Sequence, residues 1–185
     1  MLALVAVLLA NADGRSGIFL SRLLNARSDR RVVVGIAFGA FLLNAIVAAT
    51  AGAIANRMIG QGVAALLVAL ALLSAALAVL RRGRPSLFDD KALAATPTML
   101  AGRMLIAQFG DRSHFLIGAL AATSGAGQWA AAGGLVAWTL AMLPFLAFGQ
   151  GLADRRPAHI LRWASAAILM FWALVTAMAA FGLIG

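Results

Sequence analysis

The chain is dominated by long apolar stretches separated by short clusters of basic residues. Of its 185 residues, 63% are hydrophobic and 11% are charged, whereas soluble domains carry about 25% charged residues. A helix needs about 20 apolar residues to cross a bilayer. Six stretches have this length, at about 2–24, 32–55, 63–80, 96–123, 129–151 and 158–185. The sequence therefore predicts an all-α, polytopic membrane protein with six transmembrane helices.

The first stretch has a second interpretation, as a signal peptide. Ala10-Asn11-Ala12 is similar to a cleavage site. Basic residues are absent from its start, however, and the apolar run resumes after Arg15. We therefore interpret it as an uncleaved first span.

Two polar patches interrupt this apolar pattern, one in each half of the chain. The first is Asn11 to Ser16 and the second is Gln108 to His114. All six acidic residues are aspartates, and only Asp13 and Asp111 fall inside predicted spans. Charges at membrane depth are costly and usually face a cavity, a partner or an ion path. The two patches are therefore the candidate functional site.

The two halves resemble one another. Arg15-Ser16 aligns with Arg112-Ser113, and Gly35 and Gly52 recur at the same separation as Gly134 and Gly151. With three spans in each half, the second half enters the membrane from the opposite side, as in the inverted repeats of secondary transporters. We predict repeats at 1–80 and 96–185, joined by a cytoplasmic linker at 81–95, with both patches meeting at the centre.

The basic residues predict the orientation. They gather in the connections after the first, third and fifth spans, and basic loops stay cytoplasmic. Both termini are then outside. The net charge of +9 is explained by topology, so we expect a lipid bilayer as partner and no nucleic acid. A homo-oligomer or hetero-oligomer is left open.

The patches resemble the motif of a known family, the Gdt-one family of Golgi, chloroplast and bacterial calcium/manganese cation to proton exchangers. Its members carry Glu-x-Gly-Asp-(Lys/Arg)-(Thr/Ser) once in each half. The second patch matches at Gly110, Asp111, Arg112 and Ser113, with Gln108 in place of glutamate. The first matches at Arg15 and Ser16, with Asn11 in place of glutamate and Asp13-Gly14 reversing Gly-Asp. The similarity extends over essentially the whole chain.

This resemblance implies a site that binds Mn²⁺ or Ca²⁺ and exchanges it for protons. Carried over by position, the set is Asn11, Gly14, Gln108 and Asp111, with Ser16 and Ser113 as oxygen donors. Because Gly14 has no carboxylate, we take the neighbouring Asp13 in its place. The predicted cation-binding and proton-coupling set is therefore Asn11, Asp13, Ser16, Gln108, Asp111 and Ser113, with Asp13 and Asp111 as the metal ligands. Asp13 is one residue out of register with the family motif. We expect this shift to rotate it by about 100° around a helix.

The charges of the motif residues change the expectation of a divalent-cation site. The family pattern sets four carboxylates against two basic residues, whereas here Asp13 and Asp111 are balanced by Arg15 and Arg112. Divalent ions such as Ca²⁺ prefer negatively charged oxygen ligands. Our hypothesis is that divalent transport is weak, altered in selectivity or lost, with the arginines as charge partners across the pseudo-twofold axis. His114 either relays protons or caps the rim of the site.

Three functions compete at this point. The first is a secondary transporter of the divalent cation/proton exchanger type. The second is a non-transporting membrane scaffold, or a partner of an intact paralogue. The third and weaker one is a transporter of a monovalent ion or of a neutral or anionic solute, with Arg15 and Arg112 as binding groups. An enzyme is not expected, since no nucleophile is paired with a base, and no cofactor is predicted.

Overall fold

The computed structural model describes residues 1–81, 94–149, 151–152 and 156–183. The regular elements among them are all helices, which confirms the predicted all-α class. They are α1 (Leu2–Ala10), α2 (Arg15–Ala26), α3 (Arg30–Met58), α4 (Gln61–Leu80), α6 (Pro97–Gln108), α7 (Arg112–Ser124), α8 (Gly127–Phe148) and α9 (Arg156–Ala180). Most of the predicted linker at 81–95 lies outside the described residues.

Four of these helices, α3, α4, α8 and α9, are long and apolar enough to cross a membrane. A fifth span results if α1 and α2, which meet at an angle of 66°, are counted as one bent span. The predicted fourth span, at 96–123, is divided into α6 and α7. It is divided because polar residues and Gly110 interrupt the helix at its middle.

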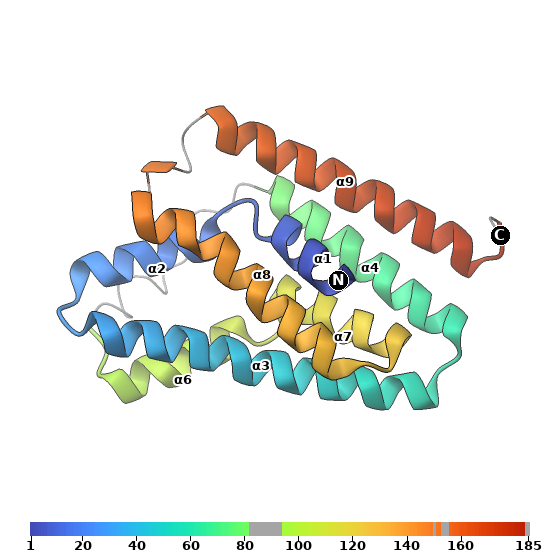
Figure 1. The fold of residues 1–185 in the computed structure, drawn as a ribbon, viewed down its shortest axis with the longest axis horizontal. Helices are drawn as coiled ribbons and strands as arrows, with labels where there is room; N and C mark the ends of the chain where they lie inside the picture. Colours follow the sequence, from blue (N-terminus) through green and yellow to red (C-terminus); the bar gives the residue numbers. More distant parts are fainter. Residues whose placement is uncertain (82–93, 150, 153–155, 184–185) are drawn as a thin grey trace.

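The helices run along the long axis of the molecule in alternating directions (Figure 1). In that view α1 with α2, α4 and α8 run from right to left, and α3, α6 with α7, and α9 run from left to right. The turn between α2 and α3 lies at the same end as the start of α6. There the Arg27 Nη1 donates a hydrogen bond to the Ala95 carbonyl oxygen at 2.6 Å.

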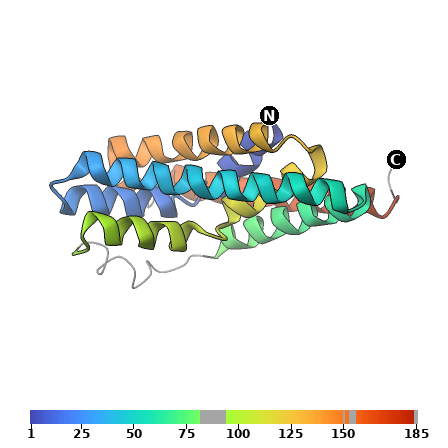
Figure 2. The same ribbon diagram turned by 90° about the horizontal axis from the view of Figure 1, so that it is seen from below.

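Each half contributes helices that pack on the other half. The helix α3 packs against α6, α7 and α8, α8 packs against α1, and α4 packs against α9. Figure 2 shows α3 between α8 on one side and α6 on the other. The two halves therefore form one interlocked bundle.

Small residues allow the closest of these contacts. A Cβ on Gly52 of α3 would lie 2.1 Å from the carbonyl oxygen of Gly118 on α7, and one on Gly134 of α8 would lie 2.4 Å from Ile117 Cδ1. Such close approach is typical of membrane helix interfaces. Gly35 and Gly151, the other two glycines that align between the halves, have no described atom within 4 Å of such a Cβ.

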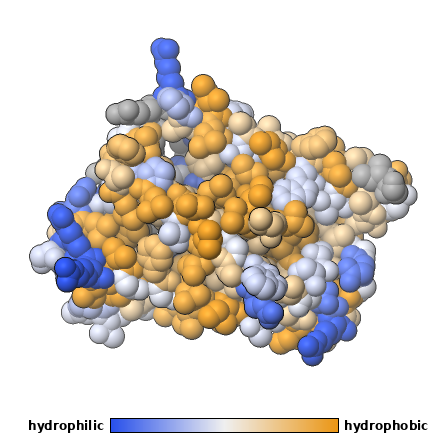
Figure 3. All heavy atoms as spheres, in the orientation of Figure 1, coloured by the Kyte–Doolittle hydropathy of each residue, from blue (hydrophilic) through white to orange (hydrophobic). Residues whose placement is uncertain are grey.

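The outer surface of the bundle is apolar along most of its length. Large hydrophobic side chains such as Leu43, Leu70, Trp163 and Phe171 are exposed. Figure 3 shows apolar residues over the middle of one face and the most polar residues at its edges. An exposed apolar surface of this extent fits a lipid environment, in agreement with the predicted membrane protein.

Candidate functional site

The first polar patch forms a break between two helices. α1 ends at Ala10, and the chain turns through Asn11, Ala12 and Asp13 before α2 begins at Arg15. Gly14 makes this turn with a left-handed φ of 69°, which glycine adopts without the penalty of a Cβ. The break is tightly covered, since a Cβ on Gly14 would lie 2.1 Å from the ring of Phe145 on α8.

The second polar patch forms a similar break. α6 ends at Gln108, Gly110 has a left-handed φ of 76°, and Asp111 is the N-cap residue of α7. Asp13 and Asp111 therefore both lie outside helices. The expected rotation of Asp13 by about 100° around a helix is wrong, because the helix stops before it.

The two breaks meet, as the sequence predicts for the two patches. The Arg112 Nη2 lies 2.5 Å from the Asp13 Oδ1 and donates a hydrogen bond to it. The side chains of Asp13 and Arg112 are only 5% and 9% exposed. A second bond joins the same turns, from the Asn11 Nδ2 to the Ser113 Oγ at 3.0 Å. Residues about one hundred positions apart thus form one buried polar cluster.

The arginines do not pair as predicted with one aspartate each. Arg112 does pair across the two halves with Asp13. Arg15 also contacts Asp13, at 3.1 Å from its Nε to Oδ2, and donates a hydrogen bond to the Arg81 carbonyl oxygen. The Asp111 carboxylate makes no ion pair or hydrogen bond with any described residue. The predicted pairing of Arg15 with Asp111 is therefore wrong, because Arg15 lies two residues from Asp13 on its own side of the break.

Several buried polar atoms around the breaks have no partner among the described residues. They are Asn11 Oδ1, Gln108 Oε1, Arg112 Nε and His114 Nδ1, and Asp13 Oδ2 has only its ion pair. Unpartnered buried polar groups cost free energy and are uncommon in native structures. Of the predicted oxygen donors, Ser16 lies in the first turn of α2, half-buried, and its hydroxyl bonds to no described residue.

His114 is buried in the first turn of α7. Its Nε2 lies 3.2 Å from the Phe41 carbonyl oxygen, and its ring packs on the Phe41 ring with centroids 4.6 Å apart. Phe41 in turn stacks on Trp138 of α8. Both roles considered for His114, as proton relay and at the rim of the site, stay predictions. No sequence pattern indicates this aromatic support, since Phe41 and Trp138 fall within uniformly apolar spans.

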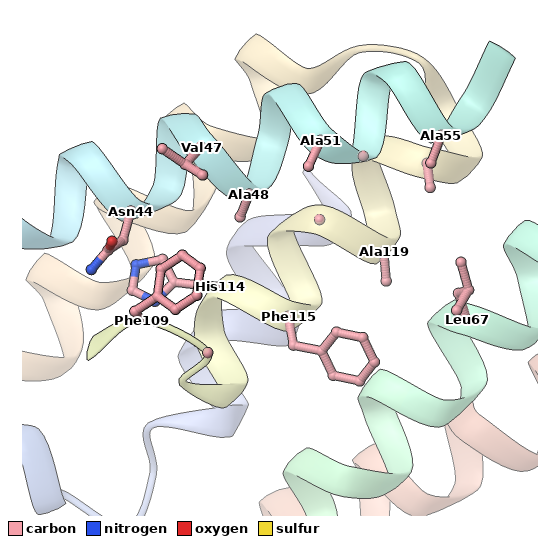
Figure 4. A pocket seen from close by; sticks show the side chains of 14 residues that line it. Asn44, Val47, Ala48, Ala51, Ala55, Leu67, Phe109, His114, Phe115 and Ala119 are labelled. Carbon is pink, nitrogen blue, oxygen red and sulfur yellow. The ribbon is translucent and has the colours of Figure 1, made fainter. Parts of the chain in front are cut away.

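An apolar groove of about 440 Å³ lies beside the second break. It is bounded by α3, α7 and Leu67 of α4, and it reaches Gly110 and His114 (Figure 4). Phe115 projects from α7 toward α4, and Phe109 also lines the groove. The second break is therefore open on one side, whereas the Phe145 ring covers Gly14 at the first.

The cluster has few metal ligands. Within the part of the chain that the structure describes, no group of three or more His, Cys, Asp or Glu side chains is placed to hold a metal ion. The predicted pair of metal ligands, Asp13 and Asp111, is thus without a third acidic or imidazole ligand there, and Asp13 is already bound by two arginines.

Comparison of the chain with protein-family models, with curated proteins and with solved structures finds no match.

Proposed function

We propose that this protein is a secondary transporter whose translocation site lies where the two helix breaks meet. The observation that carries the proposal is the buried Asp13–Arg112 ion pair, which joins the turn before α2 to the first turn of α7. Breaks in membrane helices are tolerated where the freed backbone lines a cavity or is buried in protein. In transporters such breaks commonly form the substrate site.

The arrangement of the helices supports an inverted repeat as the framework. Each element of the second half runs opposite to its counterpart in the first half: α6 with α7 against α1 with α2, α8 against α3, and α9 against α4 (Figure 1). Under this proposal α6 and α7 together form the fourth span, which brings the number of membrane crossings to six. The ends that carry Arg27, Arg30 and Arg31 would face the cytoplasm.

The cargo we propose is a cation, exchanged for protons, with a selectivity that differs from the family that the motifs resemble. The Asp13 carboxylate and the unpartnered oxygens of Asn11 and Gln108 are suitable cation ligands. Two arginines on one aspartate leave little negative charge for a divalent ion. We therefore expect weak or absent transport of Mn²⁺ and Ca²⁺.

Cation flux into proteoliposomes tests the proposal. Uptake of Mn²⁺, Ca²⁺, Na⁺ and K⁺ would be measured under an imposed proton gradient for the wild type, Asp111→Asn and Asp29→Asn. We expect proton-driven flux of at least one cation. Asp111→Asn should reduce this flux, because it removes a negative charge beside the cluster, and it should not unfold the protein, because Asp111 has no ion pair with a described residue. Asp29→Asn, at the start of α3, is the matched control and should leave flux unchanged. Equal flux in all three proteins would refute the assigned site.

A non-transporting scaffold is the second candidate function. It is favoured by the contacts of Asp13 with both Arg15 and Arg112, because a purely structural ion pair would also join the acid to neighbouring basic residues. If a correctly folded protein gave no flux of any of the four cations beyond that of empty vesicles, the result would support this alternative over transport.

A further inference from the structure

The Asp13 carboxylate lies at the crossing, the place where the two helix breaks meet, and the Arg112 guanidinium contacts it. Arg112 approaches it through one nitrogen, Nη2, and this is the one polar contact of the Arg112 side chain with the described residues. Its Nε is buried without a partner. Arginine commonly binds a carboxylate through two parallel hydrogen bonds, so this contact is only part of what the pair could form. Arg112 stands where a bound cation would stand.

Neutral oxygens lie on the same two turns. The orientation of the Asn11 amide is fixed, because its Nδ2 donates to the Val7 carbonyl oxygen at 2.8 Å and to the Ser113 Oγ at 3.0 Å. Its Oδ1 is consequently an acceptor that is buried and unpartnered, in a residue only 2% exposed. The Ser113 hydroxyl, fully buried, adds a second neutral oxygen.

Charge decides which cation fits this set of ligands. If Arg112 withdraws, the buried ligands that remain are one carboxylate and neutral oxygens, which carry at most one negative charge. A monovalent cation neutralises that charge, whereas a divalent cation would leave a buried positive charge, which is costly. Arg15, whose Nε lies 3.1 Å from the Asp13 Oδ2, lowers the available negative charge further, which disfavours a divalent cation more than a monovalent one.

We propose that the crossing of the two breaks is a monovalent-cation site in which the Arg112 guanidinium competes for the Asp13 carboxylate. The inference rests on the proposed transport site and narrows its cargo to Na⁺- or K⁺-like ions. Arg112 acts as a tethered cation that keeps the site neutral when no ion is bound. A bound ion displaces it.

Thermal stability in detergent tests this without any need for transport. The melting temperature of Arg112→Gln would be measured in NaCl, KCl, CaCl₂, MnCl₂ and N-methyl-D-glucamine chloride at equal ionic strength. We expect NaCl or KCl to raise its Tm by roughly 5 °C at saturation relative to the organic cation. The wild type should respond much less, because its own guanidinium holds the site.

Two variants serve as controls. Asp13→Asn/Arg112→Gln should lose the response, since the carboxylate is gone, and Arg15→Gln should behave as the wild type because Arg112 remains in place. The inference is overturned if Arg112→Gln responds equally to all monovalent salts including the organic one, or more to CaCl₂ or MnCl₂. An Arg112→Gln protein that is unstable in every salt also overturns it, because the cation should substitute for the guanidinium.

The flux measurement separates this inference from the proposed function. Salt-dependent stabilisation of Arg112→Gln without flux of any cation in the wild type would retain the site and reject transport. Proton-driven flux without such stabilisation would retain transport and reject Arg112 as the competitor.

Discussion

The two helix breaks are built from the same residue types in opposite order, and their surroundings differ accordingly. At the first, Asp13 precedes the left-handed Gly14, and its carboxylate contacts Arg15 and Arg112. At the second, Asp111 follows the left-handed Gly110 and becomes the N-cap residue of α7, without an ion pair to the described residues. Among the described residues, the aspartate that precedes its glycine is thus ion-paired, whereas the aspartate that follows its glycine is not.

The packing of the two glycines shows the same asymmetry. Gly14 is buried under Phe145, whereas Gly110 is exposed beside the groove, where a Cβ would meet no described atom within 4 Å. One break is therefore fixed by its neighbours and the other is accessible.

The largest expected effect comes from removing each aspartate in turn. Asp13→Asn leaves Arg112 buried without its counter-ion and should lower the free energy of unfolding by about 3–5 kcal/mol. Asp111→Asn should change it by less than about 1 kcal/mol, because no partner is lost. Reversible unfolding in mixed detergent micelles measures both values. Equal losses would contradict the asymmetry.

Alanine at the two glycines gives a smaller difference. Both substitutions place a side chain in the left-handed region, at about 1–2 kcal/mol. Gly14→Ala also overlaps the Phe145 ring, which adds about 1–3 kcal/mol. In the same unfolding assay Gly14→Ala should therefore be the less stable protein. Combining it with Phe145→Val should cost less than the sum of the two separate changes, and additive losses would argue against the contact.

Accessibility can be compared with single cysteines, because the chain has none of its own. Phe109 at the second break is 68% exposed, whereas Ala10 at the first is fully buried. We expect Phe109→Cys to react with a maleimide at least about tenfold faster than Ala10→Cys, which must wait for local opening. Similar rates, followed by mass spectrometry, would mean that both breaks are equally open.

The smallest effect concerns an ion pair at the end of the bundle. A double hydrogen bond from Arg27 lowers the pKa of Asp29, the residue before α3. A lowered carboxyl pKa contributes stability above the ordinary carboxyl range and loses it as the pH falls through the folded-state value. Asp29→Asn should therefore be less stable than the wild type at neutral pH and equal to it in strong acid. A difference that persists unchanged at low pH would contradict the pairing.

The helical class and the meeting of the two polar patches could be predicted from the sequence. Long apolar runs impose helices in a bilayer, and costly intramembrane charges tend to gather. The Arg-Ser pairs that align between the halves lie at the starts of α2 and α7, although the sequence predicts continuous spans there. These conclusions depend on composition and spacing alone.

The breaks themselves and the choice of ion pair could not be predicted in this way. A glycine within a span is compatible with a continuous helix, so the sequence alone does not reveal the left-handed turns at Gly14 and Gly110. Once the helix is broken, residue spacing no longer gives side-chain direction. Whether Arg112 reaches Asp13 or Asp111 is then decided by how two distant turns are placed.

The meeting of the two breaks through Asp13 and Arg112 is tested most directly by a double-mutant cycle. The free energy of unfolding would be measured for the wild type, Asp13→Asn, Arg112→Gln and the double variant, in a salt of an organic cation. We predict a coupling of at least about 1.5 kcal/mol, with the double variant more stable than the sum of the single losses implies. Additive losses, with no coupling, would contradict the contact between the two breaks.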